Sequence, residues 1–125
     1  MRWSFQADTP TYTQLVARLQ EQIVSGAYPP GSKLPSVRDL AADAGVNPNT
    51  VQRAFAELER LGLIYTQRTS GKFVTEDAAA IDAARRALAE GQTRQYLAAM
   101  SALGFDRAAL ITFLNQMEET KDANS

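Results

Sequence analysis

The chain has 125 residues, which is the size of one domain or of one small domain with an appendage. It contains no cysteine and no histidine, and this excludes disulfides, thiolate nucleophiles, cysteine-based zinc sites and catalysis by a histidine base. The formal net charge is −1, which argues against a simple polycation that coats nucleic acid. Because no stretch approaches the roughly 18 apolar residues that span a bilayer, and no secretory signal begins the chain, we expect a cytoplasmic protein.

The charges are unevenly distributed along the chain. Residues 1–75 carry 8 basic and 6 acidic side chains, whereas residues 76–125 carry 5 basic and 8 acidic ones. We therefore expect two regions, a slightly basic domain over residues 1–75 and an acidic helical tail over residues 76–125.

The first expected helix runs from about residue 10 to residue 25. One apolar stripe at helical spacing supports it: Tyr12, Leu15, Val16, Leu19 and Ile23. Two starts are open, because Pro10 suits the first helical position after Thr9, and Thr11 with Gln14 has the spacing of a capping box.

Two shorter helices follow, separated by a tight turn. Ser36 suits the N-cap of a helix that ends at Gly45. Asn47 and Pro48 then suit the cap and the first position of a third helix, over about residues 48–61. Its apolar stripe predicts one buried face: Val51, Ala54, Phe55, Leu58 and Leu61.

The next segment predicts a β-hairpin, and the rest of the chain predicts helix. Residues 63–67 and 72–75 are rich in β-branched and aromatic side chains around a turn at residues 69–71. From residue 76 the helical phase continues to about residue 103 through Gly91, whose interior position costs only about 1 kcal/mol, so we favour one long helix that can bend there. A last helix is expected over about residues 107–119, with Asp106 as its N-cap.

This order of elements predicts a mainly α fold with a small β-hairpin, namely a winged helix-turn-helix followed by a two-helix tail. In such a fold the short second helix and its turn present the third helix to the major groove of DNA. The polar face of the expected recognition helix carries groups that bond to base edges or phosphates: Asn49, Thr50, Gln52 and Arg53. The hairpin, over about residues 63–75, would act as a wing at the flank.

Further polar side chains are expected at the DNA backbone. Ser36 and Arg38 lie at the start of the second helix, where an anion is favoured. Arg68 and Lys72 flank Gly71 and make a basic wing tip, able to reach phosphates or a minor groove. Arg38 and Arg53 could each also be an ordinary solvated side chain, and for Arg60, at the far end of the third helix, we expect that.

The sequence resembles the GntR family of bacterial transcription regulators over about residues 9–75, and its YtrA subfamily over nearly the whole chain. Five stretches carry the resemblance: 12–15 (YTQL), 31–41 (GSKLPSVRDLA), 46–51 (VNPNTV), 54–62 and 71–74 (GKFV). The family implies a DNA-binding regulator, by family habit a repressor, that binds a palindromic operator as a homodimer.

Carried over by position, the resemblance implies that eight residues contact DNA: Ser36, Arg38, Asn47, Asn49, Thr50, Gln52, Arg53 and Gly71. Three positions depart from the family pattern. Gln52 stands where the family often has arginine, Pro48 stands where relatives outside the subfamily have arginine, and the basic residue of the wing tip is displaced to Lys72. The wing contacts are therefore less firmly implied than those of the third helix.

The tail carries more apolar surface than its two helices bury against each other, and we expect it to form a self-complementary dimer interface. Eight residues are predicted there: Leu88, Tyr96, Met100, Leu103, Leu110, Phe113, Leu114 and Met117. No cofactor or metal is expected. Any small-molecule effector should bind at the dimer interface or in the cleft between tail and DNA-binding domain.

Two other function classes remain as alternatives. A winged-helix module that binds proteins would place acidic residues on the exposed first half of the third helix, and none is there. An enzyme would need a nucleophile, a base or a metal site, and the sequence offers no such combination.

Overall fold

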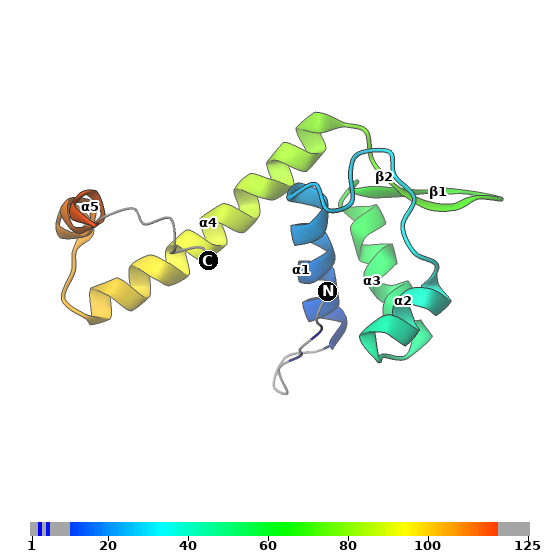
Figure 1. Ribbon diagram of the computed structural model, residues 1–125, viewed down its shortest axis with the longest axis horizontal. Helices are drawn as coiled ribbons and strands as arrows, with labels where there is room; N and C mark the ends of the chain where they lie inside the picture. Colours follow the sequence, from blue (N-terminus) through cyan, green and yellow to red (C-terminus); the bar gives the residue numbers. More distant parts are fainter. Residues whose placement is uncertain (1–2, 4, 6–10, 118–125) are drawn as a thin grey trace. The chain divides into compact units, whose positions relative to one another are not determined.

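The computed structural model describes residues 3, 5 and 11–117 (Figure 1). Within these residues seven elements follow one another: α1 (Thr11–Val24), α2 (Val37–Ala44), α3 (Pro48–Arg60), β1 (Ile64–Gln67), β2 (Gly71–Val74), α4 (Ala78–Ala102) and α5 (Arg107–Gln116). Every expected element is present. Residues 9 and 10, where the first helix was expected to begin, and residues 118 and 119, where the last was expected to end, lie outside the described residues.

The core is built mainly by α1 and α3. Leu15, Leu19 and Ile23 of α1 are almost fully buried, as the apolar stripe predicted. From α3 the buried side chains are Val51, Ala54, Phe55 and Leu58. Since both helices turn one apolar face inward, their opposite faces remain in solvent.

The helix-turn-helix is fixed by two caps and a glycine. Ser36 Oγ accepts a hydrogen bond from the backbone N–H of Asp39 (3.0 Å), and Asn47 Oδ1 accepts one from the N–H of Asn49 (2.8 Å). Between the helices Gly45 has φ +72°, a conformation that side chains other than glycine rarely adopt. The caps confirm the predicted starts of α2 and α3.

The hairpin contains one difference from the sequence prediction. Gly71 belongs to β2 and pairs with Gln67, so the turn covers residues 68–70 rather than 69–71. The backbone N–H of Ser70 closes the turn on the carbonyl of Gln67 (3.0 Å). The periodicity of side chains alone does not determine this register, which depends on the turn geometry.

A third segment of backbone pairs with β2, although the sequence predicted only an irregular connection there. The N–H of Leu34 donates to the carbonyl of Lys72 (2.8 Å), and the N–H of Val74 donates to the carbonyl of Ser32 (2.9 Å). Lys33 thereby faces Phe73 in a single antiparallel bridge. These bonds attach the wing to the connection that precedes α2.

The chain divides into two compact units, the first ending at Ala87 and the second beginning at Leu88. The first unit therefore extends past residue 75, where the sequence suggested a boundary. The reason is packing: Ile81, in the first turn of α4, is 6% exposed and belongs to the same core as α1 and α3, and Ala84 packs against it.

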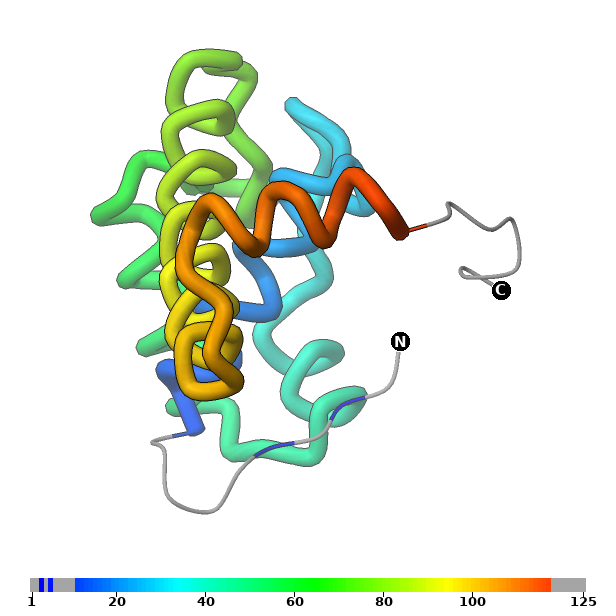
Figure 2. The backbone as a smooth tube through the Cα atoms, turned by 90° about the vertical axis from the view of Figure 1, so that its left-hand side faces the viewer, coloured from blue at the N-terminus to red at the C-terminus, as the bar shows by residue number. Residues whose placement is uncertain are grey.

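The second unit contains the end of α4 and α5. Helix α4 is continuous from Ala78 to Ala102, which confirms the prediction of one helix through Gly91. Asp106 caps α5 by accepting a hydrogen bond from the N–H of Ala109 (2.8 Å), and α5 runs across the end of α4 (Figure 2). Among the described residues no single helix is both long and apolar enough to cross a membrane, and α4 and α5 meet the two conditions only together, as a pair bent by 97°.

Replacing Phe55 tests the core. Phe55→Ala should lower the free energy of unfolding by about 3–5 kcal/mol, because it leaves a cavity between α1 and α3. Gln52→Ala, on the exposed face of the same helix, should change it by less than about 0.5 kcal/mol. Urea unfolding followed by circular dichroism at one fixed protein concentration measures both, and equal losses would contradict the packing described.

Candidate nucleic-acid interface

The outward face of α3 is polar along its first half. Asn49, Gln52, Arg53 and Ala56 are exposed and follow one another at helical spacing, opposite the buried stripe. The first three carry amide and guanidinium groups, which form paired hydrogen bonds with the edges of adenine and guanine. Thr50, also predicted at the site, is half-buried beside them. The structure thus places the predicted recognition residues together on one accessible surface.

Two predicted site residues serve as helix caps. The side-chain oxygens of Ser36 and Asn47 are each bonded to a backbone N–H of the helix that they begin. Both residues are exposed, as is Arg38 on the first turn of α2. Their caps orient the N-termini of α2 and α3, and Arg38 is available to bind an anion there.

Arg53 rests on the aromatic ring of Tyr12, a residue that helical spacing had predicted in the core stripe. Its guanidinium carbon Cζ lies 3.8 Å from the centroid of the Tyr12 ring, so this contact joins α3 to α1. Thr11, Tyr12, Asn49, Thr50 and Arg53 line a shallow depression of about 310 Å³ on this surface. The first turn of α1 therefore belongs to the candidate interface, and only tertiary contact reveals this.

The wing presents two cations near its tip. Arg68 is exposed in the turn between the strands, as predicted. Lys33, which no sequence motif had indicated, lies over Gly71: a Cβ built on that glycine would meet Lys33 Cε at 3.2 Å. Gly71 also has φ +111°. The positive φ favours glycine at this position, whereas the flexible lysine would need to shift by only a few tenths of an ångström to admit a Cβ.

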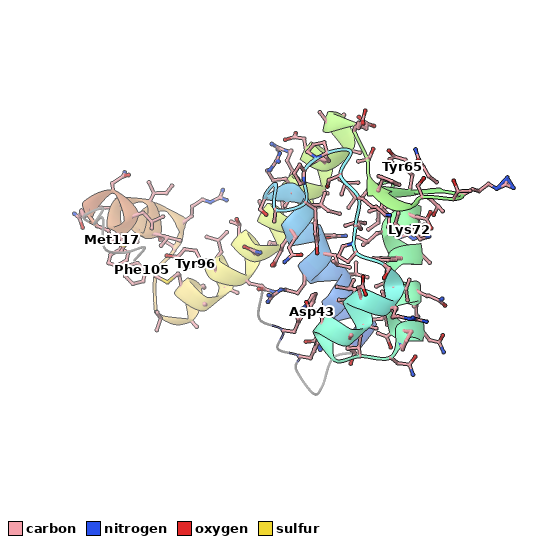
Figure 3. All side chains as sticks on the ribbon, turned by 45° about the vertical axis from the view of Figure 1, so that its right-hand side comes forward. Asp43, Tyr65, Lys72, Tyr96, Phe105 and Met117 are labelled. Carbon is pink, nitrogen blue, oxygen red and sulfur yellow. The ribbon has the colours of Figure 1, made fainter. Side chains whose placement is uncertain are left out.

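The side chain of Lys72 is directed to α3, although the residue itself lies next to the wing tip. Its Nζ donates hydrogen bonds to Glu59 Oε1 (3.2 Å) and to Thr66 Oγ1 (2.7 Å), and its side chain is 27% exposed. In Figure 3, Tyr65 and Lys72 are labelled on the hairpin. Because side chains alternate along a strand, Thr66 and Lys72 share the face that meets α3, while Tyr65 stacks on Phe73.

Two glutamates of α3, Glu57 and Glu59, accept hydrogen bonds from neighbouring side chains, and both have a lowered pKa. A hydrogen bond from the Thr66 hydroxyl, together with Lys72, holds the pKa of Glu59 below its usual value. Arg60 donates two hydrogen bonds to Glu57 (3.0 and 2.6 Å), and these lower the pKa of Glu57. Arg60 is therefore an ordinary surface partner of Glu57, as expected from the sequence.

The tail places its apolar side chains mostly in solvent. Tyr96 is 43% exposed, and Tyr96, Phe105 and Met117 are labelled in Figure 3. On α5 and before it, the exposed apolar side chains are Leu103, Ile111, Phe113, Leu114 and Met117. Leu110, although predicted at the dimer interface, is 4% exposed within the single chain and offers no further surface to a partner. Leu88 and Met100 are half-buried.

A family model described as "Bacterial regulatory proteins, gntR family" matches residues 11–74, from the start of α1 to the end of β2. The chain belongs to the gntR family. Its helix-turn-helix and wing, described above, lie within the matched residues, so the predicted family and fold are confirmed. A GntR-type chain of this kind is a DNA-binding transcriptional regulator.

Individual GntR relatives extend the comparison. The HTH-type transcriptional repressor YtrA of Bacillus subtilis is 46% identical over 72 residues, which are 58% of this chain and 55% of YtrA. A GntR family transcriptional regulator from Listeria monocytogenes is 40% identical, with a TM-score of 0.82 over 91% of this chain and 100% of that one. AraR(DBD) in complex with operator ORX1 is 28% identical, with a TM-score of 0.56 over 60% of this chain and 96% of that one.

The anchoring of the wing on α3 in this GntR protein is tested by titration. Because the pKa of Glu59 is lowered in the folded protein, its pairing with Thr66 and Lys72 stabilises the fold at pH values above the pKa of the unfolded state. This stabilisation is lost as the pH falls through the pKa of the folded state. Thr66→Val should move the pKa of Glu59 upward, toward its ordinary value, and leave Glu57 unchanged. Carboxyl ¹³C NMR titration measures both residues, and an unchanged Glu59 would contradict the contact.

Proposed function

We propose that this GntR protein is a transcriptional repressor that binds a palindromic operator as a homodimer in the cytoplasm. The single observation that carries the proposal is the exposed stripe of Asn49, Gln52 and Arg53 on α3, beside the exposed Arg38. Those side chains are able to read base edges and to hold phosphates without rearrangement of the core. The operator complex of AraR, which shares the fold, supports DNA as the ligand, and the name of YtrA supports repression.

Recognition in this proposal divides between α3 and the wing. Asn49, Thr50, Gln52 and Arg53 enter the major groove, while the N-termini of α2 and α3, with Ser36, Arg38 and Asn47, lie against the DNA backbone. At the flank, Arg68 and Lys33 extend beside Gly71. Lys72 contributes mainly to holding the wing, because Glu59 neutralises its charge.

The homodimer is proposed from the apolar side chains of the tail. Tyr96, Leu103, Phe113, Leu114 and Met117 are all more than a third exposed. Large apolar side chains left exposed in this number within one short segment are typical of an association surface. A two-fold axis would bury it in a self-complementary contact and would hold two α3 helices about one DNA turn apart, roughly 34 Å, or a multiple of it.

Binding to DNA is tested with fragments selected from genomic DNA by the protein itself and with the DNA upstream of its own operon. Fluorescence anisotropy should show tighter binding to the selected duplex than to random DNA, and affinity should fall as salt rises because bound counterions are released. Equal binding to both duplexes at every salt concentration would overturn the proposal.

Two substitutions separate backbone contacts from base reading. Arg38→Ala should weaken binding to all duplexes and reduce the salt slope by about one, as for one lost phosphate contact. Asn49→Ala should instead relax the preference at one base pair, by about 1–3 kcal/mol. Anisotropy titrations over single-base variants of the selected site measure both effects, and the reverse pattern would reassign the two residues.

Dimerisation is tested on α5. Leu114→Asp should shift the protein from dimer to monomer and weaken operator binding, since a charge in an apolar contact is costly. Asn115→Asp, an exposed neighbour with the same added charge, serves as the matched control and should remain dimeric. Sedimentation equilibrium measures the association, and a dimer that survives Leu114→Asp would place the interface elsewhere.

A further inference from the structure

The guanidinium of Arg53 is supported by a ring from another helix. Its Cζ is 3.8 Å from the centroid of Tyr12, within the distance at which a cation is attracted by the face of an aromatic ring. Tyr12 is half-buried and packs against the core, whereas Arg53 is exposed. Since arginine also stacks on aromatic rings through its flat guanidinium, the core of the protein gives this flexible side chain a fixed position.

The described part of the chain leaves the hydrogen-bond donors of Arg53 unused. Across residues 11–117, where the structure describes the chain without a gap, Arg53 makes neither a hydrogen bond nor an ion pair. Arg60, two turns further along α3, donates both of its bonds to Glu57. Arg53 is therefore held through its face while its N–H groups stay free, and Asn49 and Thr50 line the same depression.

We propose that Tyr12 is a specificity-determining positioning residue, whose ring holds the guanidinium of Arg53 so that it reads a guanine in the operator half-site. This inference rests on the proposed function. Guanine offers O6 and N7 side by side, and arginine bonds to both at once. An arginine that is already stacked loses less side-chain freedom when it binds than one that is free in solvent.

Two other roles for these residues predict different behaviour. Arg53 would contact a phosphate if it served affinity alone, and its removal would then weaken all duplexes equally. Tyr12 would contact DNA directly through its hydroxyl if the ring played no part, and Tyr12→Phe would then weaken binding. In the proposed role Tyr12→Phe retains the ring and behaves as the wild type.

The test uses the full chain and a duplex selected from genomic DNA, with each guanine of the half-site replaced in turn by 7-deazaguanine, which lacks the N7 acceptor. One of these replacements should lower the affinity of the wild type and of Tyr12→Phe for the duplex by about three- to tenfold. Arg53→Ala, Tyr12→Leu and Tyr12→Met should be insensitive at that guanine. Tyr65→Leu, which removes an exposed ring of the wing, is the control and should remain sensitive.

The double variant decides whether Tyr12 acts through Arg53. Tyr12→Leu should reduce discrimination when Arg53 is present and should have no further effect in the Arg53→Ala background. In the free protein, NMR should show that Tyr12→Leu removes the ring-current shift of Arg53 Nε–H while the melting temperature stays within a few degrees. If Tyr12→Leu unfolds the chain, Tyr12→Met, which fills similar space, provides the same comparison.

Several results would overturn the inference. They are retained sensitivity to 7-deazaguanine in both Tyr12→Leu and Tyr12→Met, uniform weakening by Tyr12→Phe, or a uniform loss with a smaller salt slope in Arg53→Ala. A wild-type protein that binds the selected duplex no more tightly than random DNA would overturn the proposed function, and the role of Tyr12 with it. The ring-current shift of Arg53 is measured without DNA. It therefore shows whether the stacking of Arg53 on Tyr12 is present even if the protein binds no specific DNA.

Discussion

The contact between α1 and α3 determines which side chains reach DNA. Phe55 and Leu58 are fully buried against α1, and burial of large apolar side chains is worth about 1.5–3 kcal/mol each. A helix with one face held in this way presents the opposite face without further adjustment. Asn49, Gln52 and Arg53 are consequently exposed because of the packing behind them, and the same contact places Tyr12 beneath Arg53.

The electrostatic attraction of the first unit to DNA is weaker than the number of its basic residues suggests. Lys72 and Arg60 are paired with Glu59 and Glu57, so their charges are largely neutralised within the protein. For a protein whose net charge is −1, this leaves little general attraction to DNA. Affinity in the proposed complex then depends on a few placed contacts and on simultaneous binding by two subunits.

The wing shows how one residue can have a role that its position in the sequence does not suggest. Lys72 follows Gly71 in the predicted basic tip, yet it points to α3 and connects the wing to the recognition helix. Lys33 comes from the connection before α2, about forty residues earlier in the chain, and lies over Gly71. The charge near the tip is thus supplied by Lys33 and Arg68.

The amino-acid sequence was sufficient to predict the elements, the caps of α2 and α3, the family and the polar face of α3, because helical periodicity and capping chemistry are local properties. Tertiary structure alone decided the register of the hairpin, the extension of the core to Ile81, the burial of Leu110 and the partners of Lys72 and Arg53. Each of these depends on groups that are distant along the chain, and side-chain spacing carries no information about which distant groups meet. The physical reason is that packing selects among arrangements that local preferences leave equal.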